Sequence, residues 1–252
     1  MNGTNKLDGR RALITGASRG IGAAIALAFA DQGCDVAFCH LGDGEKAADV
    51  KRTVEDRGRK AFVAECDVAD EVALPVMVAR TRKALGGIDI LVNNAGHSAE
   101  TPFEKIPVVA WDRMIAVHLR GTFLASRACY GAVCESGWGR IINVASQHAL
   151  KGTLDKAHYC AANAGIIGFT KALAREGATK GVLVNAIAPG PVETDLFREL
   201  SEEWRDAKLA ELPLGRFAAA SEIAPTAVML ASSDGAYYVG QTLSPNGGDV
   251  MA

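Results

Sequence analysis

A serine and a tyrosine thirteen positions apart are the residues of this sequence best suited to chemistry. Ser146 follows an apolar run, and Tyr159 lies in AHYCAANAG (157–165), with Asn163 four positions later. Four residues are about one helical turn, so Tyr159 and Asn163 would share one face of a helix. A pair of hydroxyls can stabilise the negative charge that hydride transfer builds on a carbonyl oxygen, and can deliver a proton to it. These residues are therefore suited to chemistry on a carbonyl or alcohol oxygen.

A glycine-rich turn provides a candidate cofactor site. The stretch TGASRGIG (15–22) follows the apolar run RALIT and precedes an alanine-rich helical pattern. Gly16, Gly20 and Gly22 permit a tight turn and a close approach of the backbone to a pyrophosphate, which the N-terminus of the following helix attracts. The spacing is G-x-x-x-G-x-G, and the alternative is a tight strand–helix turn without a ligand.

Two more turns come directly after apolar runs. They are NNAG (93–96) and PGPVETD (189–195). Asparagine and glycine also favour ordinary turns, so NNAG could be a plain turn that binds no ligand. If the apolar runs are parallel strands, however, all of these motifs lie at the carboxyl ends of strands, where ligands of such sheets bind.

Alternating strand and helix patterns predict the elements that position these residues. Strands are expected at 11–15, 35–39, 61–66, 88–93, 140–145, 182–187 and 241–245, and helices at 23–32, 45–57, 72–85, 111–134, 157–178 and 222–232. The central strands are apolar on both faces, as in a parallel sheet covered by helices. We predict an α/β fold with a Rossmann-type, doubly wound, seven-stranded parallel sheet. No linker or repeat interrupts residues 1–252, so one domain is expected.

Together these motifs resemble the short-chain dehydrogenase/reductase family over nearly the whole chain, in particular its beta-ketoacyl-carrier-protein-reductase-like branch. The resemblance implies a nicotinamide cofactor, with hydride transfer between a small carbonyl compound and a secondary alcohol. It implies that Ser146 holds the substrate oxygen and that Tyr159 exchanges the proton. It places the cofactor against Gly16, Ser18, Arg19, Gly20, Ile21, Gly22, His40, Asp67, Val68, Asn94, Ala95, Gly96, Tyr159, Asn163, Pro189, Gly190, Val192 and Thr194. Within that set, Asp67 would contact adenine, and Val192 and Thr194 would contact the carboxamide and phosphate side.

The sequence departs from this family at two catalytic positions. Asn163 stands where members usually have lysine, and His118 stands where they usually have asparagine. A nearby ammonium lowers the pKa of an acid by about 1–3 units, so its loss costs the tyrosinate on the order of 1–4 kcal/mol. Asn163 could still hydrogen-bond the nicotinamide ribose. We hypothesise that His118 relays protons instead; the alternative is a buried histidine that bonds a backbone carbonyl. Lys156, one turn before Tyr159, is expected to reach solvent.

The end of the second strand bears on the choice of cofactor. A carboxylate there binds the ribose of NAD, whereas basic groups favour the 2′-phosphate of NADP. His40 occupies the carboxylate position, and Arg19 lies in the glycine turn. These residues favour NADP, while Asp43, slightly further on, keeps NAD open.

Substrate contacts are expected from His97, Gln147 and His148, which follow the site motifs. For the two histidines the alternative is a solvated loop. The segment 196–214, with Phe197, Leu200 and Trp204, is expected either to cover the pocket or to pack against another subunit. His158, next to Tyr159, is expected to pack in the interior.

Bulk composition excludes several classes of protein. The net charge of −2 gives no reason to expect a nucleic-acid or anionic-membrane partner. No apolar run reaches the roughly 20 residues of a membrane span, so we expect a cytoplasmic protein. The six cysteines form no CxxC pair and predict free, mostly buried thiols. The five histidines show no metal-ligand spacing, and no metal is expected. The resemblance implies a homotetramer. The rival hypothesis is a catalytically impaired nucleotide-binding protein that acts as a sensor or partner subunit.

Overall fold

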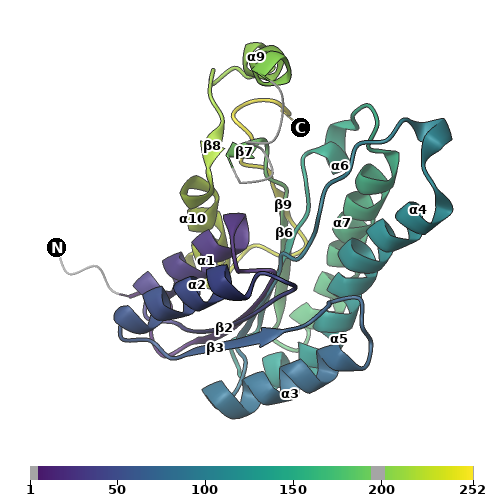
Figure 1. The fold of residues 1–252 in the computed structure, drawn as a ribbon. Coiled ribbons are helices and arrows are strands. Elements are labelled where there is room, and N and C mark those ends of the chain that lie inside the picture. Colours follow the sequence, from purple (N-terminus) through teal and green to yellow (C-terminus); the bar gives the residue numbers. More distant parts are fainter. Residues whose placement is uncertain (1–4, 194–201, 252) are drawn as a thin grey trace.

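A seven-stranded parallel sheet forms the centre of the computed structural model, which describes residues 5–193 and 202–251 (Figure 1). The strands run in the order β3-β2-β1-β4-β5-β6-β9. Their bounds are β1 (Arg11–Thr15), β2 (Asp35–His40), β3 (Ala61–Glu65), β4 (Ile90–Asn93), β5 (Arg140–Val144), β6 (Leu183–Ile187) and β9 (Thr242–Leu243). This arrangement confirms the predicted fold class, and β1 and β4 flank the point where the strand order reverses.

Helices cover both faces of the sheet and divide the interior into two cores (Figure 1). The first face carries α1 (Gly20–Asp31), α2 (Gly44–Asp56) and α10 (Ala220–Ala231), and the second carries α3 (Ala73–Leu85), α5 (Gly121–Glu135) and α7 (Ala157–Ala178). Successive strand residues point to opposite faces. Ile14 therefore packs in the first core and Leu13 in the second, and neither is exposed. Burial on both faces explains why the central strands read as continuous apolar runs.

The helix expected at 111–134 has an irregular centre. It consists of α4 (Val108–Ile115), one π-helical turn η2 (Ala116–Arg120) and α5. A π turn widens the helix locally, and such turns occur frequently at functional sites. His118 lies in this turn. The apolar periodicity of the sequence does not reveal it, because the widening inserts no helix-breaking residue.

Several short elements lie outside the predicted set. They are α6 (His148–Lys151), α9 (Glu202–Glu211), the paired strands β7 (Val192–Glu193) and β8 (Ala218–Ala219), and the 3₁₀ turns η1 (Phe103–Lys105) and η3 (Ser233–Gly235). All but α9 are too short to leave a periodic pattern. α9 falls within the expected covering segment 196–214, whereas Phe197, Leu200 and the side chain of Trp204 lie outside what the structure describes.

The remaining global expectations concern membranes and cysteines. None of the helices at 5–193 and 202–251 is long and apolar enough to span a bilayer. All six cysteines are free thiols, as predicted, and Cys34, Cys39, Cys66 and Cys129 are buried.

Candidate active site

Ser146 is fixed where the carboxyl ends of β5 and β6 meet. The backbone N–H of Ala145 donates to the carbonyl oxygen of Ile187 at 2.7 Å, and that of Gln147 donates to Pro189 at 3.1 Å. These bonds hold the residues on either side of Ser146 against the chain that leaves β6. Only 7% of Ser146 is exposed, so its hydroxyl occupies a defined position at the sheet edge.

Tyr159 reaches this serine from the first turn of α7. Burial raises the pKa of the Tyr159 phenol, and a side-chain hydrogen bond with Ser146 partly offsets the increase. The Ser146 oxygen also accepts a hydrogen bond from the backbone N–H of His148 at 3.2 Å. The fold thus brings together the two hydroxyls that are separated by thirteen positions, and the phenol keeps its proton at neutral pH.

Asn163 lies one turn further along α7 and is 1% exposed. Its amide nitrogen donates to the backbone carbonyl oxygen of Tyr159 at 2.9 Å. This bond back to the preceding turn is a common choice for polar side chains inside helices. Asn163 therefore supports the helix under Tyr159 but brings it no positive charge.

His118 packs beside Tyr159 from the π turn. The two rings meet edge to face with their centroids 5.3 Å apart. His118 Nε2 lies 2.8 Å from the carbonyl oxygen of His97 and 3.0 Å from the His97 backbone nitrogen, so either neutral tautomer finds a partner there. The backbone contact left open by the sequence is thus present, and the relay role stays a prediction.

A pH-dependent loss of stability follows from the burial of His118. Burial lowers its pKa from 6.5 to about 4, so protonation favours the unfolded chain as the pH falls through this window. The contribution of neutral His118 to the free energy of unfolding is fully present above pH 6.5. At pH 5, protonation of His118 in the unfolded chain lowers the free energy of unfolding by about 2 kcal/mol. We expect His118→Asn to lose correspondingly less stability than the wild type between pH 7 and pH 5, as measured by urea unfolding at both values. Equal losses would show that His118 is not held neutral in the folded chain.

The other histidines occupy different surroundings. His97 is exposed and lines the cavity described below, with its ring centroid 5.6 Å from that of His118. His148 lies with its ring centroid 6.2 Å from that of Tyr159, and burial followed by the charges of nearby lysines lowers its pKa to about 4. His158 is 1% exposed and packs in the interior, as expected.

Two side chains near the site point differently from what the sequence suggested. The expectation that Lys156 reaches solvent was wrong, because its side chain is 13% exposed and its Nζ lies 3.0 Å from Glu100 Oε1. Gln147, an expected substrate contact, is 2% exposed and donates from its amide nitrogen to Asp249. Both pairings join distant segments, so neither leaves a local signal in the sequence.

A cavity of about 490 Å³ lies at the carboxyl ends of β1, β2 and β4. Of the residues expected to contact a cofactor, it is lined by Gly16, Ser18, Arg19, Gly20, Ile21, His40, Asp67, Val68, Asn94, Ala95 and Gly96. The other expected residues, Gly22, Tyr159, Asn163, Pro189, Gly190 and Val192, do not line it, and Thr194 lies outside the described residues. The cavity therefore matches one part of the expected site, around the glycine turn.

The glycine turn and the NNAG turn interlock along this cavity. Gly16 has a φ of +66°, and a Cβ there would lie 2.7 Å from the Cα of Ala95. A Cβ on Gly22 would lie 2.4 Å from Asn94 Nδ2, which donates to the carbonyl oxygens of Thr15 and Gly16. Side chains at either glycine would separate the two turns, so the glycines are required for a cradle that fits a pyrophosphate.

Polar groups at the end of β2 fit the ribose side of a dinucleotide. Asp43 Oδ2 lies 3.0 Å from Arg19 Nε and accepts a hydrogen bond from Ser18 at 3.2 Å. His40 lines the same cavity, and its buried Nδ1 has no hydrogen-bond partner in the described part of the chain. A carboxylate and a guanidinium can bind ribose hydroxyls or a phosphate.

Sequence reasoning missed Arg113 on α4. Its Nη1 lies 2.8 Å from Asp67 Oδ2, and both residues line the cavity. The lining is completed by Cys39, Leu41, Asp43, Cys66 and Val117. Arg113 lies within a helix without a motif, and only the fold shows that it faces the end of β3.

The chain is similar to known proteins over nearly its whole length. Residues 16–249 match the family described as enoyl-(acyl carrier protein) reductase. The chain is 44% identical to nodulation protein G of Azospirillum brasilense, over 94% of this chain and 96% of that protein. It is 38% identical to a 3-oxoacyl-[acyl-carrier-protein] reductase of Staphylococcus aureus, over 96% of this chain and 98% of that protein.

A solved structure extends the likeness to the fold and to the cofactor. It is a short-chain dehydrogenase from Burkholderia cenocepacia in complex with NADP, with a TM-score of 0.91 and 33% identity over 97% of this chain and 99% of that one. The Rossmann-type sheet, the glycine cradle and these relatives lead to one conclusion: the chain belongs to the short-chain dehydrogenase/reductase family of NAD(P)-binding oxidoreductases.

Proposed function

We propose that this protein is an NADPH-dependent reductase that converts a small carbonyl compound into a secondary alcohol, with a Y-x-x-x-N active site. The observation that carries this proposal is the proximity of Ser146 and Tyr159 at the carboxyl edge of the sheet, where Ser146 lowers the pKa of the buried phenol. Tyr159 contacts His118, and the His118 ring in turn neighbours His97, which lines the cavity that fits a dinucleotide. A site without turnover has no chemical requirement to keep both hydroxyls in contact.

The state of Tyr159 favours the reductive direction. Reduction creates an alkoxide, and the group that protonates it must carry a proton beforehand. Burial raises the pKa of Tyr159, so the phenol is protonated at neutral pH. A bound reduced nicotinamide supplies the hydride. Ser146 would hold the carbonyl oxygen as charge develops there, and Tyr159 would donate its proton to that oxygen.

The substrate we propose to try first is a 3-oxoacyl thioester. The Staphylococcus aureus relative is named for reducing such a group on acyl carrier protein. Acetoacetyl-CoA carries the same 3-oxoacyl thioester in a soluble form. His97, Gln147 and His148 are the proposed substrate-side residues, and Gln147 acts there by way of its bond to Asp249.

Phosphate recognition at the end of β2 favours NADPH over NADH. Arg19 would bind the 2′-phosphate after leaving Asp43, which holds it at 3.0 Å in the present structure. His40 lines the same wall of the cavity. The carboxylate of Asp43 would instead serve the hydroxyls of NADH, so the two cofactors are expected to bind with different affinity.

Family resemblance also led to the expectation of a homotetramer, which we retain as a proposal. Apolar side chains on α4 and α5 support it, because Val108 and Val109 are each 75% exposed and Phe123 is 41% exposed. Phe123 pairs with Phe169 of α7, so these exposed groups extend across neighbouring helices.

The alternative, a nucleotide-binding protein without turnover, draws support from Asn163, whose amide is bound to the Tyr159 carbonyl and supplies no charge. Two measurements separate the two functions. Tryptophan fluorescence during titration with NADPH and NADH reports binding, and the absorbance of reduced nicotinamide with acetoacetyl-CoA and a panel of ketones reports turnover. We expect tighter binding of NADPH and steady oxidation with at least one carbonyl. Binding without oxidation of any of them would support the alternative.

A further inference from the structure

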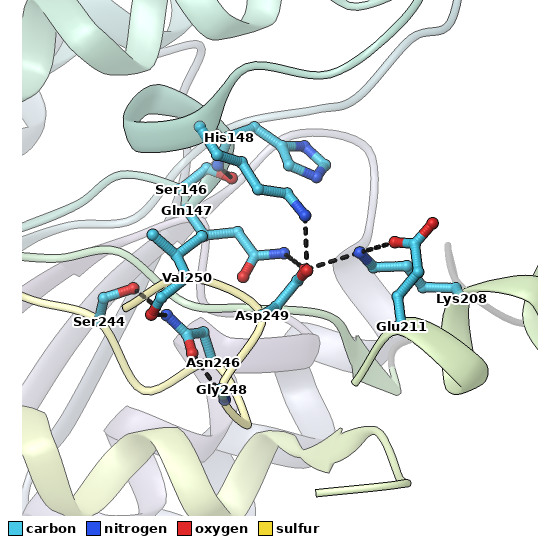
Figure 2. Close-up of polar contacts among 11 residues, drawn as sticks. Ser146, Gln147, His148, Lys208, Glu211, Ser244, Asn246, Gly248, Asp249 and Val250 are labelled. Atoms are coloured by element: carbon cyan, nitrogen blue, oxygen red, sulfur yellow. Dashed lines mark hydrogen bonds and ion pairs between the residues drawn. The ribbon is translucent and has the colours of Figure 1, made fainter. Parts of the chain in front are cut away.

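Asp249, close to the end of the chain, joins three separate segments at the substrate side of the site. Its side chain is only 4% exposed. The carboxylate accepts hydrogen bonds from Gln147 Nε2 and, at 2.7 Å, from Lys208 Nζ (Figure 2). It also accepts one from Lys151 Nζ. Asp249 belongs to none of the motifs identified in the sequence. Its contacts form because β9 returns the chain to the edge of the sheet.

Each of the three donors belongs to a part of the site. Gln147 adjoins Ser146, and Lys151 ends the short helix α6 that follows it. Lys208 lies on α9, within the segment expected to cover the substrate pocket, and its side chain is 9% exposed. A single carboxylate therefore connects the covering helix to the loop that carries the catalytic hydroxyl.

The charges make this connection depend on Asp249. Two ammonium groups face one carboxylate, and the side chains of Asp249 and Lys208 are 4% and 9% exposed. Removing one member of such a buried pair leaves an uncompensated charge. Burial would raise the pKa of Asp249, but the bonds from Lys151, Lys208 and Gln147 outweigh it and lower that pKa. Lys208 has a second partner, Glu211, on the exposed side of α9, where 62% of the Glu211 side chain meets solvent.

The turn that presents Asp249 is itself braced. Asn246 donates from its amide to the carbonyl oxygen of Val250 and to Ser244 Oγ, and accepts from the backbone N–H of Gly248 (Figure 2). The backbone N–H of Leu214, just after α9, donates to Gly247 at 3.0 Å. The carboxylate is thus held in place independently of the groups that bind to it.

Gln147 shows what the carboxylate does for the catalytic loop. Its Nε2 donates to Asp249, whereas its buried Oε1 has no hydrogen-bond partner among the described residues. In this part of the chain, the orientation of the amide therefore depends on Asp249.

We propose that Asp249 is a positioning residue that holds α9 closed over the substrate, through Lys208, and orients the loop of Ser146, through Gln147. This inference rests on the proposed reductase function, because closure and loop orientation matter for turnover. It assigns two separable effects to one carboxylate: the charge fixes the helix, and the hydrogen-bond acceptor fixes the loop.

Two substitutions at this position separate these effects. Asp249→Asn keeps an acceptor for Gln147 but removes the charge that Lys208 and Lys151 bind. It should raise the KM for acetoacetyl-CoA about tenfold, with kcat changed less than about threefold, on the scale of a lost charge-assisted hydrogen bond. Asp249→Ala removes the acceptor as well, and should in addition lower kcat by about tenfold, because Ser146 is then less well placed.

Lys208→Met tests the helix side of the network. It should reproduce the KM increase of Asp249→Asn, and the double variant should be no worse than either single one, because both changes break the same contact. Glu211→Gln is the matched control: it removes the exposed partner of the same lysine and should leave the KM within about twofold. Affinity for NADPH should stay within about twofold in every variant, which a general loss of structure would not allow.

Hydrogen exchange of the backbone amides of α9 provides a readout that needs no turnover. Exchange at 202–211 should be at least about tenfold faster in Asp249→Asn and Lys208→Met, but not in Glu211→Gln. If none of the carbonyl compounds tested supports NADPH oxidation by the wild-type protein, but exchange is still faster in the two variants, the reductase proposal fails. The role of Asp249 in holding α9 then stands. Unchanged exchange and unchanged KM in both variants would overturn the role of Asp249. So would a rise in KM accompanied by equally large decreases in kcat and in NADPH affinity.

Discussion

Tyr159→Phe is expected to lower kcat with acetoacetyl-CoA by about 10²–10⁴-fold, the range for loss of a positioned proton donor. The ring stays, so its edge-to-face contact with His118 is preserved and the site keeps its shape. The missing hydroxyl removes the proton for the alkoxide and the partner of Ser146. Steady-state absorbance of reduced nicotinamide measures the rate.

NADPH affinity serves as the internal control for this variant. Tyr159 does not line the cavity beside the glycine turn, so affinity for the cofactor should change by less than about threefold. Tyr237→Phe is a matched substitution at a side chain that is 98% exposed, and it should be without effect. Wild-type turnover in Tyr159→Phe would remove the tyrosine from the mechanism.

The second large effect is expected from Asn163→Lys. An ammonium near the phenol should lower the pKa of Tyr159, which burial now raises, and should move the rate optimum about 1–3 units toward lower pH. Activity at neutral pH should rise, because a proton donor is most effective when its pKa lies near the working pH. The change must be made in a position that is 1% exposed, where the amide now bonds the Tyr159 carbonyl. A pH profile of kcat measures the shift.

Length and charge are separated by a matched variant. Asn163→Met introduces a long side chain without charge and loses the same hydrogen bond, so it should not move the pH optimum. If Asn163→Lys gains nothing, or loses activity while remaining folded, the site is adapted to work without the cation, and the relay through His118 becomes the better account.

The sequence predicted those features that depend on local pattern. Paired apolar runs and turns gave all seven strands of the sheet, and α7 was predicted at its observed bounds of Ala157–Ala178. Gly16 and Asn94 lie in recognisable turns, and both line the observed cavity. Such motifs are visible because the backbone itself restricts which residues they can contain.

The features that were missed are contacts between distant segments. Lys156 pairs with Glu100, Arg113 pairs with Asp67, and Asp249 binds Gln147, which lies 102 positions earlier in the chain. Charged residues of this kind have the same appearance in sequence whether they meet solvent or a partner. The π turn at His118 was missed for a different reason, since a helix can widen without any change in composition.

The central claim is that Ser146 and Tyr159 act together as one proton-delivering pair, and the double variant Ser146→Ala/Tyr159→Phe tests it most directly. The measurement is kcat/KM for NADPH-dependent reduction by the wild type, both single variants and the double variant. Because members of a catalytic unit are strongly non-additive, the double variant should be within about threefold of Tyr159→Phe. The account would be contradicted if the fold-decrease in kcat/KM of the double variant equalled the product of the two single decreases. It would also be contradicted if the single variants matched the wild type.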